Sequence, residues 1–191
     1  CDRKCRLREK NAETFVDHDD PIVSSLARGV IRHHQDDDWF HRGATFNDMV
    51  YRSSMELSKL LNGDRSMRTN LVAHVVIEML LDAYLHEQHP GDLDRYYAQI
   101  ETVDPSQVQS AINLFATRET NQLTEYIERF RNDKFLFDYA TDEGVLFRMN
   151  KVLRRVGLEE LPEEILGWCE SIRQSVHRQA DELLYQYEKL T

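Results

Sequence analysis

One stretch constrains the fold more than any other: residues 71–85, with the sequence LVAHVVIEMLLDAYL. Almost every residue in it is apolar, so a helix over these residues would have no solvated face and would have to pack inside a bundle. His74, Glu78 and Asp82 are the exceptions, and they recur every four residues. Because four residues advance about 400° around a helix, these three side chains form one stripe. The sequence therefore predicts a buried helix with an ionisable stripe.

The buried stripe requires groups that compensate its carboxylates, because an ionised side chain taken out of water is costly unless it is paired or bound to a metal. Arginines from another helix could pair with Glu78 and Asp82. A facing helix could instead supply the remaining ligands of a metal ion. His74 by itself is also compatible with a hydrogen-bonded core histidine. A second ionisable stripe elsewhere in the chain would favour the metal site.

Such a stripe lies in residues 33–41, HHQDDDWFH. On a helix, His33, Asp37 and His41 share one face, and His34 and Asp38 share the neighbouring face. Helical bundles build metal sites from imidazole and carboxylate groups on facing helices, because the backbone fixes the direction of ligands one turn apart. Mixed nitrogen and oxygen ligands suit Mn²⁺, Fe²⁺ or Zn²⁺, and Mg²⁺ where carboxylates dominate. The same run of charges is also typical of the solvated end of a helix.

The composition favours an all-helical fold, because glycine and proline are scarce (7 and 4 residues) and no alternating strand pattern occurs. We expect the mostly charged residues 1–19 to form a loose lead-in, and residues 20–191 to form a single compact domain of seven to eight helices. The expected helices span residues 20–41, 45–61, 67–88, 91–101, 105–116, 119–132, 134–156 and 162–189. The expected core residues of the central helix are Val75, Val76, Met79 and Leu80.

Local signals define several of these helix ends. Asp20-Pro21 and Asp104-Pro105 each combine an N-cap residue with a proline at the first helical position. Asn62-Gly63 and Gly157 end helices, because asparagine and glycine tolerate the left-handed backbone conformation that closes a helix.

A basic face is expected near residue 150. Arg148, Lys151 and Arg155 follow one another at i, i+3 and i+7, with Arg154 beside them. In an acidic chain such a face could bind a phosphate group. The alternative is a solvated face that pairs with nearby acidic residues.

Charge and hydropathy exclude two classes of partner. The formal net charge is −10 and the pI is about 5.3, which argues against a nucleic-acid backbone as partner. No apolar run reaches 18 residues without His, Glu or Asp inside it, and no signal-peptide pattern opens the chain, so we expect a soluble protein without a membrane partner. The three cysteines, Cys1, Cys5 and Cys169, do not make a disulfide framework, which favours the cytoplasm.

The two stripes resemble a known family. The segment GVIRHHQDDDWFH, from Gly29, resembles the GI-x-x-HR-x-ID-x-x-TD segment of acyl carrier protein phosphodiesterases. The segment VIEMLLDAYL, from Val76, resembles their LDVMWDHFL helix. A weaker similarity runs through FDYATDEGVLFRMNKVLRRVG, residues 137–157, so the resemblance covers roughly residues 30–160. It implies an HD-like helical bundle, because these enzymes are similar to divergent, all-helical HD-type phosphohydrolases.

The resemblance also implies an activity and a site. Enzymes of this family use a divalent metal, typically Mn²⁺, to hydrolyse the phosphodiester that links 4′-phosphopantetheine to a carrier-protein serine. On this match His33 takes the place of the motif histidine and Asp37 that of its first aspartate. Glu78 and Asp82 take the places of two aspartates on the second helix. These four would bind the metal, and Asp37 and Asp82 would also be catalytic. The additional candidate ligands or supporting residues are His34, Asp38, His41 and His74.

The chain departs from the family pattern at three points. The second aspartate of the first segment is His41 here, and the histidine that follows the second aspartate of the helix is Ala83. The opening segments of the family have no counterpart in residues 1–28.

Two hypotheses follow. The first is a metal-dependent phosphodiesterase or phosphohydrolase that acts on a phosphorylated small molecule or on a phosphopantetheinylated carrier protein, with Arg148, Lys151 and Arg155 as its phosphate-binding face. The second is a non-catalytic helical domain in which the polar stripe is a structural salt-bridge network and the acidic surface serves protein association. The sequence leaves assembly into a homo-oligomer open.

Overall fold

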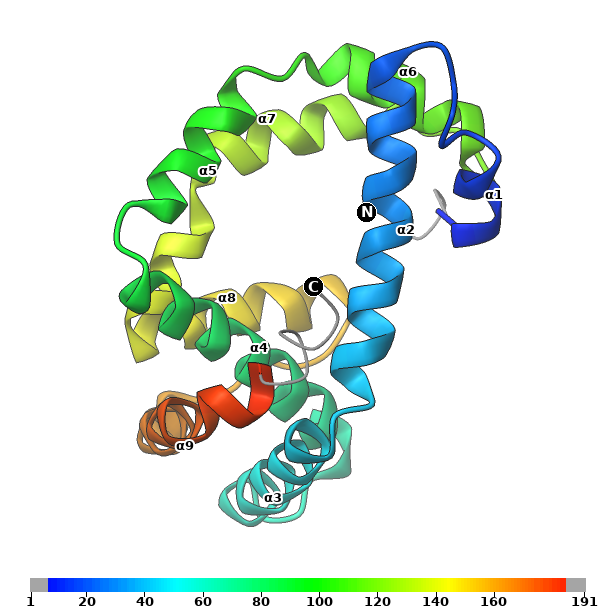
Figure 1. Ribbon diagram of the computed structural model, residues 1–191. Coiled ribbons are helices and arrows are strands. Elements are labelled where there is room, and N and C mark those ends of the chain that lie inside the picture. The colour runs from blue at the N-terminus through cyan, green and yellow to red at the C-terminus, as the bar shows by residue number, and fades with distance from the viewer. Residues whose placement is uncertain (1–6, 185–191) are drawn as a thin grey trace. The chain divides into compact units, whose positions relative to one another are not determined.

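The computed structural model describes residues 7–184, which form helices and their connections (Figure 1). The α-helices are α1 (Glu9–Glu13), α2 (Pro21–His41), α3 (Ala44–Leu60), α4 (Thr69–Gln88), α5 (Asp92–Glu101), α6 (Pro105–Phe115), α7 (Leu123–Asp133), α8 (Asp142–Arg155) and α9 (Leu166–Leu184). The 3-10 helices are η1 (Arg65–Met67), η2 (Phe135–Ala140) and η3 (Glu163–Ile165). No strand occurs within residues 7–184, which confirms the expected all-helical class. No helix in this range is long and apolar enough to span a membrane.

The chain groups into two compact units. Within the described residues, the first unit comprises residues 7–40 and 94–134, and the second comprises residues 41–93 and 135–184. The boundary at residue 41 assigns all of α2 except its last residue, His41, to the first unit. The single domain expected over residues 20–191 stays a prediction.

The first unit has a small apolar core. Its buried residues come from α1, α2 and α6 and are Ala12, Val23, Ala27, Ala111, Ile112 and Phe115. The Asp20 side chain accepts a hydrogen bond from the backbone N–H of Ile22 (2.8 Å), which confirms the expected cap of α2. Asp104 likewise caps α6, and the hydrogen bonds from Ser106 lower the pKa of its carboxyl.

The segment expected to be a loose lead-in contains a helix. Residues 9–13 form α1, in which Ala12 is fully buried. The Asn11 side chain donates a hydrogen bond to the Phe115 carbonyl oxygen (3.2 Å), which attaches α1 to the end of α6. A five-residue helix is too short to show an apolar period, so its packing depends on contacts distant in the sequence. Residues 1–6 lie outside the described part.

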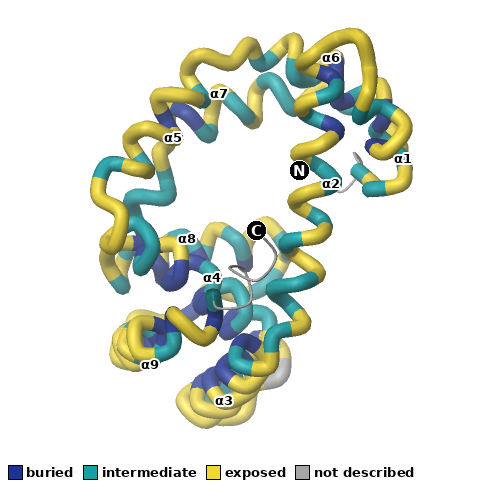
Figure 2. The backbone as a smooth tube through the Cα atoms, viewed as in Figure 1, coloured by how far each residue is buried: buried dark blue, intermediate teal, exposed yellow. Residues whose placement is uncertain are grey.

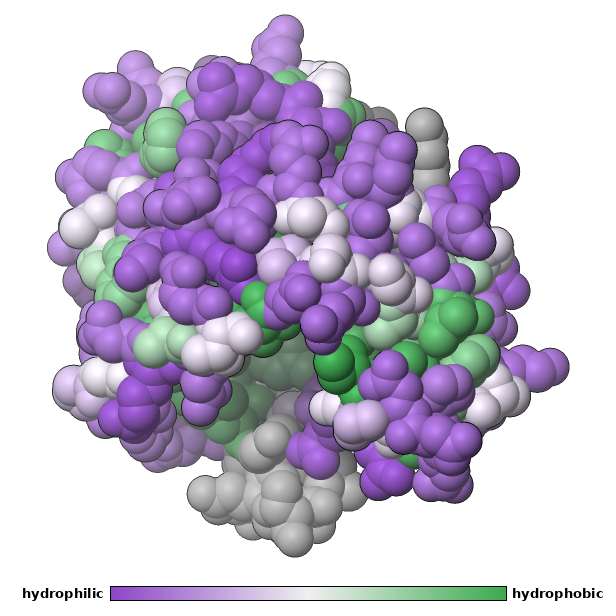
Figure 3. Space-filling view, turned by 90° about the horizontal axis from the view of Figure 1, so that it is seen from above, coloured by the Kyte–Doolittle hydropathy of each residue, from purple (hydrophilic) through white to green (hydrophobic). Residues whose placement is uncertain are grey.

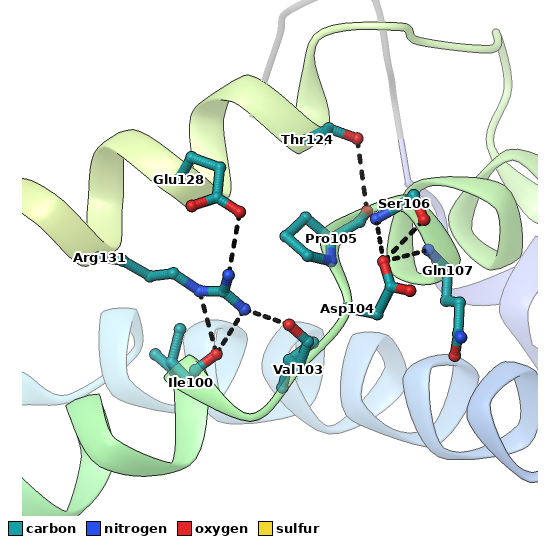
Figure 4. A network of polar contacts seen from close by, with 9 residues as sticks. All are labelled: Ile100, Val103, Asp104, Pro105, Ser106, Gln107, Thr124, Glu128 and Arg131. Atoms are coloured by element: carbon teal, nitrogen blue, oxygen red, sulfur yellow. Dashed lines mark hydrogen bonds and ion pairs between the residues drawn. The ribbon is translucent and has the colours of Figure 1, made fainter.

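A buried arginine joins α7 to the end of α5 (Figure 4). Arg131 is only 7% exposed, and its guanidinium donates hydrogen bonds to the carbonyl oxygens of Ile100 and Val103. It also forms an ion pair with Glu128 at 3.0 Å. The last carbonyl groups of a helix have no partner within the helix, so Arg131 satisfies the end of α5 and its connection to α6.

The second unit is built around α4, as the sequence predicts. This helix packs against α3, α8, α9 and η2 (Figure 2). Its buried residues are Val72, Ala73, Val76, Ile77, Met79, Leu80, Leu81 and Ala83. The expected core positions Val76, Met79 and Leu80 are confirmed, whereas Val75 is only partly buried, so the prediction for Val75 was wrong. Val75 lies four residues after Leu71 and three before Glu78 on the helix, and both of these residues are also only partly buried.

Helix α9 contributes a buried tryptophan and a buried thiol to this unit. The Trp168 indole N–H donates a hydrogen bond to the Ser53 carbonyl oxygen (3.1 Å), which links α9 to α3. Burial raises the pKa of the Cys169 thiol to about 12, and the nearby Asp142 adds to this effect. The thiol is therefore protonated and unreactive at neutral pH.

Several helix ends differ from the expected ones. The helix expected over residues 134–156 is divided into η2 and α8, because the Thr141 hydroxyl accepts a hydrogen bond from the Gly144 N–H (3.1 Å) and starts a new helix. Residues 65–67 form η1, so α4 begins at Thr69. Asn62, Gly63 and Gly157 have positive φ angles of 53°, 73° and 76°, which confirms the expected helix ends. The final helix is described to Leu184, and its expected end near residue 189 lies outside the described residues.

The face of the molecule seen in Figure 3 is mostly hydrophilic, and hydrophobic residues reach it only in small patches. This surface agrees with the 30% of charged residues in the chain. Several large apolar side chains nevertheless remain exposed, among them Tyr51, Leu60 and Leu114.

Candidate metal centre

Three donor atoms converge in the second unit. They are Nε2 of His41, Nε2 of His74 and an Oε1 oxygen of Glu78. His41 Nε2 lies 3.0 Å from both the His74 nitrogen and the Glu78 oxygen, and the last two atoms are 3.3 Å apart. His41 is the last residue of α2, and His74 and Glu78 lie one turn apart on α4. Two helix segments thus supply two imidazoles and a carboxylate to one point.

The triangle has the dimensions of one face of a metal coordination sphere. Bonds from zinc to imidazole nitrogen or carboxylate oxygen are about 2.0–2.2 Å long. Donor atoms at these separations could all bind one ion at bond lengths of about 2.1 Å. Two histidines and one glutamate are also a ligand set that catalytic zinc sites use, together with a water molecule.

The cluster is accessible from solvent. The side chains of His41, His74 and Glu78 are 27%, 33% and 38% exposed. An ion could therefore enter without unfolding of the core, and a water molecule or a substrate could reach its open side. This degree of exposure distinguishes the cluster from a closed structural site.

The arrangement also favours a cation on electrostatic grounds. The two imidazole nitrogens face each other at 3.0 Å, and both face the same carboxylate oxygen. If each nitrogen donated a proton to Glu78, the two N–H groups would oppose each other. A metal ion would accept a lone pair from all three atoms at once. The rings of His41 and His74 are stacked, with centroids 4.7 Å apart and an interplanar angle of 17°, which keeps both nitrogens on one side.

Asp82 lies one turn beyond Glu78 on α4, outside the three-residue cluster. Burial raises the pKa of its carboxyl to about 6, and the Glu78 carboxylate adds to this effect. Asp82 is nevertheless exposed at the surface, so solvent screens part of this effect. Neither Glu78 nor Asp82 pairs with an arginine within residues 7–184. Among the described residues, these carboxylates therefore do not form the arginine network expected as the alternative.

The four ligands implied by the family resemblance share one member, Glu78, with the observed cluster. His33 and Asp37 lie at exposed positions of α2 in the first unit, outside the cluster. Their role as ligands stays a prediction, as does that of Asp82. Of the additional candidates, His41 and His74 belong to the cluster. The other two do not: the His34 ring nitrogen lies 3.1 Å from the Leu7 carbonyl oxygen, and Asp38 is exposed on α2.

The sequence alone predicts part of this cluster. The spacing of His74 and Glu78 places them on one face of a helix. The sequence also places His41 on the same stripe as His33 and Asp37, but it does not say which end of this stripe meets α4. The selection of His41 depends on the short turn at residues 42–43 that connects α2 to α3.

One residue of the basic face expected near residue 150, Arg148, forms an ion pair within the second unit. The Arg148 side chain is 13% exposed, and its guanidinium pairs with Asp138 at 2.5 Å and lies 5.3 Å from the ring centres of both Phe135 and Phe147. The Lys151 ammonium lies 4.4 Å from the Phe147 ring centre. Lys151 and Arg155 are exposed. Phosphate binding by Arg148, Lys151 and Arg155 stays a prediction.

Comparison of this chain with models of protein families, with curated proteins and with solved structures gives no match.

Proposed function

We propose that the protein binds a divalent transition-metal ion at His41, His74 and Glu78 and uses it to hydrolyse a phosphate ester. The observation that carries this proposal is the triangle of donor atoms with sides of 3.0, 3.0 and 3.3 Å. A metal ion held on one side of this triangle would lower the pKa of a bound water to about 7 and would polarise a phosphoryl oxygen. Both effects promote attack of water on phosphorus.

The ligand set limits the choice of metal. Two imidazole nitrogens and one carboxylate oxygen favour Zn²⁺, Fe²⁺ or Mn²⁺ over Mg²⁺, which prefers oxygen ligands. Mn²⁺ is the ion that the family resemblance implies. Zn²⁺ is the ion that the donor atoms suit best.

The substrate part of the proposal is supported by the resemblance of residues 29–41 and 76–85 to acyl carrier protein phosphodiesterases. A phosphodiester is therefore the proposed substrate class, either in a small molecule or at the attachment of phosphopantetheine to a carrier protein. Asp82 lies on the same helix as two of the ligands and is the proposed acid–base group. Asp37 stays a proposed catalytic residue on the resemblance alone.

Elemental analysis and metal titration of the purified protein test the metal site. We expect about one ion of Zn²⁺ or Mn²⁺ per chain, and we expect His41→Ala to weaken binding by about 100-fold or more, since a ligand is removed. His33→Ala is the matched control, because His33 lies on the same helix but outside the cluster. Binding that depends on His33 but not on His41 would contradict this assignment.

Hydrolysis of bis(p-nitrophenyl) phosphate tests the reaction. We expect the metal-loaded wild-type protein to release p-nitrophenol, and we expect His41→Ala and a chelator each to abolish the release. Metal binding without hydrolysis of this diester or of a phosphopantetheinylated carrier protein would refute the enzymatic part of the proposal.

The alternative is a non-catalytic helical domain. Glu78 and Asp82, the carboxylates of its expected network, have no arginine partner within residues 7–184, but a mostly buried ion pair occurs elsewhere. In the second unit, Arg173 pairs with Asp142 at 2.8 Å and both side chains are mostly buried, at 16% and 21% exposure. This pair joins α9 to α8 and contributes to packing rather than to chemistry. Absence of metal binding in the titration would favour the non-catalytic alternative.

A further inference from the structure

Two residues of α3 that contact His41, Phe46 and Asn47, lie side by side in the first turn of the helix. Phe46 is 2% exposed, and its ring lies 5.4 Å from the His41 ring and 5.1 Å from the His74 ring, at interplanar angles of 69° and 83°. The edge-to-face arrangement with both rings restricts their rotation. Phe46 therefore holds both imidazoles with their Nε2 atoms toward Glu78.

Asn47 holds the backbone of the same ligand. Its side-chain amide donates hydrogen bonds to the carbonyl oxygen of His41 (2.8 Å) and to that of Gly43 (2.9 Å). The carbonyl of His41 is at the C-terminal end of α2, where carbonyl groups lack a partner within the helix. Both acceptors are carbonyl oxygens, so the orientation of the Asn47 amide is defined by its partners. Asn47 thus fixes the turn that ends α2 and begins α3.

We propose that Phe46 and Asn47 are positioning residues of the metal centre. They orient the ring and the backbone of His41 so that its Nε2 atom lies beside the two donor atoms of α4. This inference rests on the proposed metal site but concerns residues that do not bind the ion. A ligand at the end of a helix has more freedom than His74 and Glu78, which lie inside α4. Groups that orient a ligand in this way typically contribute a factor of 10–100 to metal affinity.

The test uses Asn47→Ala, because Asn47 is exposed and its removal leaves the core intact. Asp48→Ala is the matched control: Asp48 is the next residue of the same turn, is exposed, and pairs with Arg52 away from the cluster. Zn²⁺ affinity is measured by competition with a chromophoric chelator. The ligand geometry is measured from the visible absorption of the Co²⁺-loaded full chain.

We expect Asn47→Ala to weaken Zn²⁺ binding by about 10–100-fold and to change the Co²⁺ spectrum. We expect Asp48→Ala to leave both unchanged. The Tm of Asn47→Ala in chelator should stay within about 4 °C of wild type, which separates loss of positioning from loss of folding. Phe46→Leu should produce the same spectral change, with a larger drop in Tm because a buried ring is lost.

Two further outcomes separate this inference from the proposed function. If wild type binds Zn²⁺ and Asn47→Ala retains both the affinity and the Co²⁺ spectrum, the positioning role is refuted and the metal site stands. If wild type binds neither ion, the metal site and the positioning role are both refuted.

Discussion

The substitution Glu78→Gln separates a metal ligand from a structural ion-pair member, because it removes the charge and keeps the shape. Without metal, Glu78 contacts two partly exposed imidazoles, and its own side chain is 38% exposed. Exposed pairs of this kind contribute about 0–1 kcal/mol to stability. Loss of the negative charge should therefore change the free energy of unfolding in chelator by less than about 1 kcal/mol.

With metal the effect is much larger. At a free metal concentration of 100 times the wild-type Kd, binding to the folded state stabilises wild type by about 2.7 kcal/mol. If the neutral amide weakens binding about 100-fold, the variant gains only about 0.4 kcal/mol at the same concentration. The expected difference between the two proteins is therefore about 2.3 kcal/mol with metal and close to zero in chelator.

Urea denaturation of wild type and Glu78→Gln, with chelator and with metal, measures both values. Asp37→Asn is the matched control, because Asp37 is a carboxylate that the family resemblance implies as a ligand but that lies outside the cluster. If Asp37→Asn weakens metal binding as strongly as Glu78→Gln, the wider ligand set is correct. A loss of about 3–5 kcal/mol in chelator for Glu78→Gln would show a structural charge pair and would refute the reasoning.

Three further predictions concern the scaffold and its pH dependence. Arg131→Met should lower the free energy of unfolding by about 2–4 kcal/mol in urea denaturation, because two carbonyls at the end of α5 lose a charged donor. A loss below about 0.5 kcal/mol would contradict this role. Gly144→Ala should cost about 1–3 kcal/mol, because its Cβ would lie 1.9 Å from the Asp138 carbonyl oxygen. Gly29→Ala, with no atom within 4 Å of the new Cβ, should instead gain about 1 kcal/mol, and equal effects at both glycines would refute the steric argument. The pKa of the Asp82 carboxyl in the folded state is about 6, above its ordinary value of 3.8. Ionisation of this carboxyl therefore lowers the stability of the fold as the pH rises through this range. Asp82→Asn should therefore be more stable than wild type at pH 8 in chelator, by on the order of 1 kcal/mol after solvent screening of the exposed group, and the difference should vanish below about pH 3. A difference that is independent of pH would show that ionisation is not its cause.

The sequence predicted those parts of the fold that depend on residues close together in the chain. The apolar run of α4 identified the central helix, and the cap at Asp104 placed the start of α6 at the correct residue. The helix break at Thr141 was missed, although threonine is a common N-cap residue and residues 141–144 contain no apolar side chain. The short α1 was missed because five residues do not establish a period.

The residues of the candidate site likewise include some that the sequence could predict and one that it could not. The spacing of His74 and Glu78 within one helix is a local property, and the sequence predicted it. The third donor is supplied by a residue far away in the chain, and His33 and His41 are equivalent on a helical stripe. Only the packing of the turn after α2 selects His41, so this choice required the structure.

The buried thiol of Cys169 provides a natural reporter of motion in the unit that carries the cluster. A thiol with a pKa near 12 and no exposed surface reacts with an alkylating reagent only when the packing around α9 opens. The rate of alkylation, read by mass spectrometry at this one cysteine, therefore measures how often the second unit opens. A metal ion that binds only the closed form would slow this rate in proportion to its occupancy. Metal binding can thus be followed through a cysteine that the chain already contains, without any substitution.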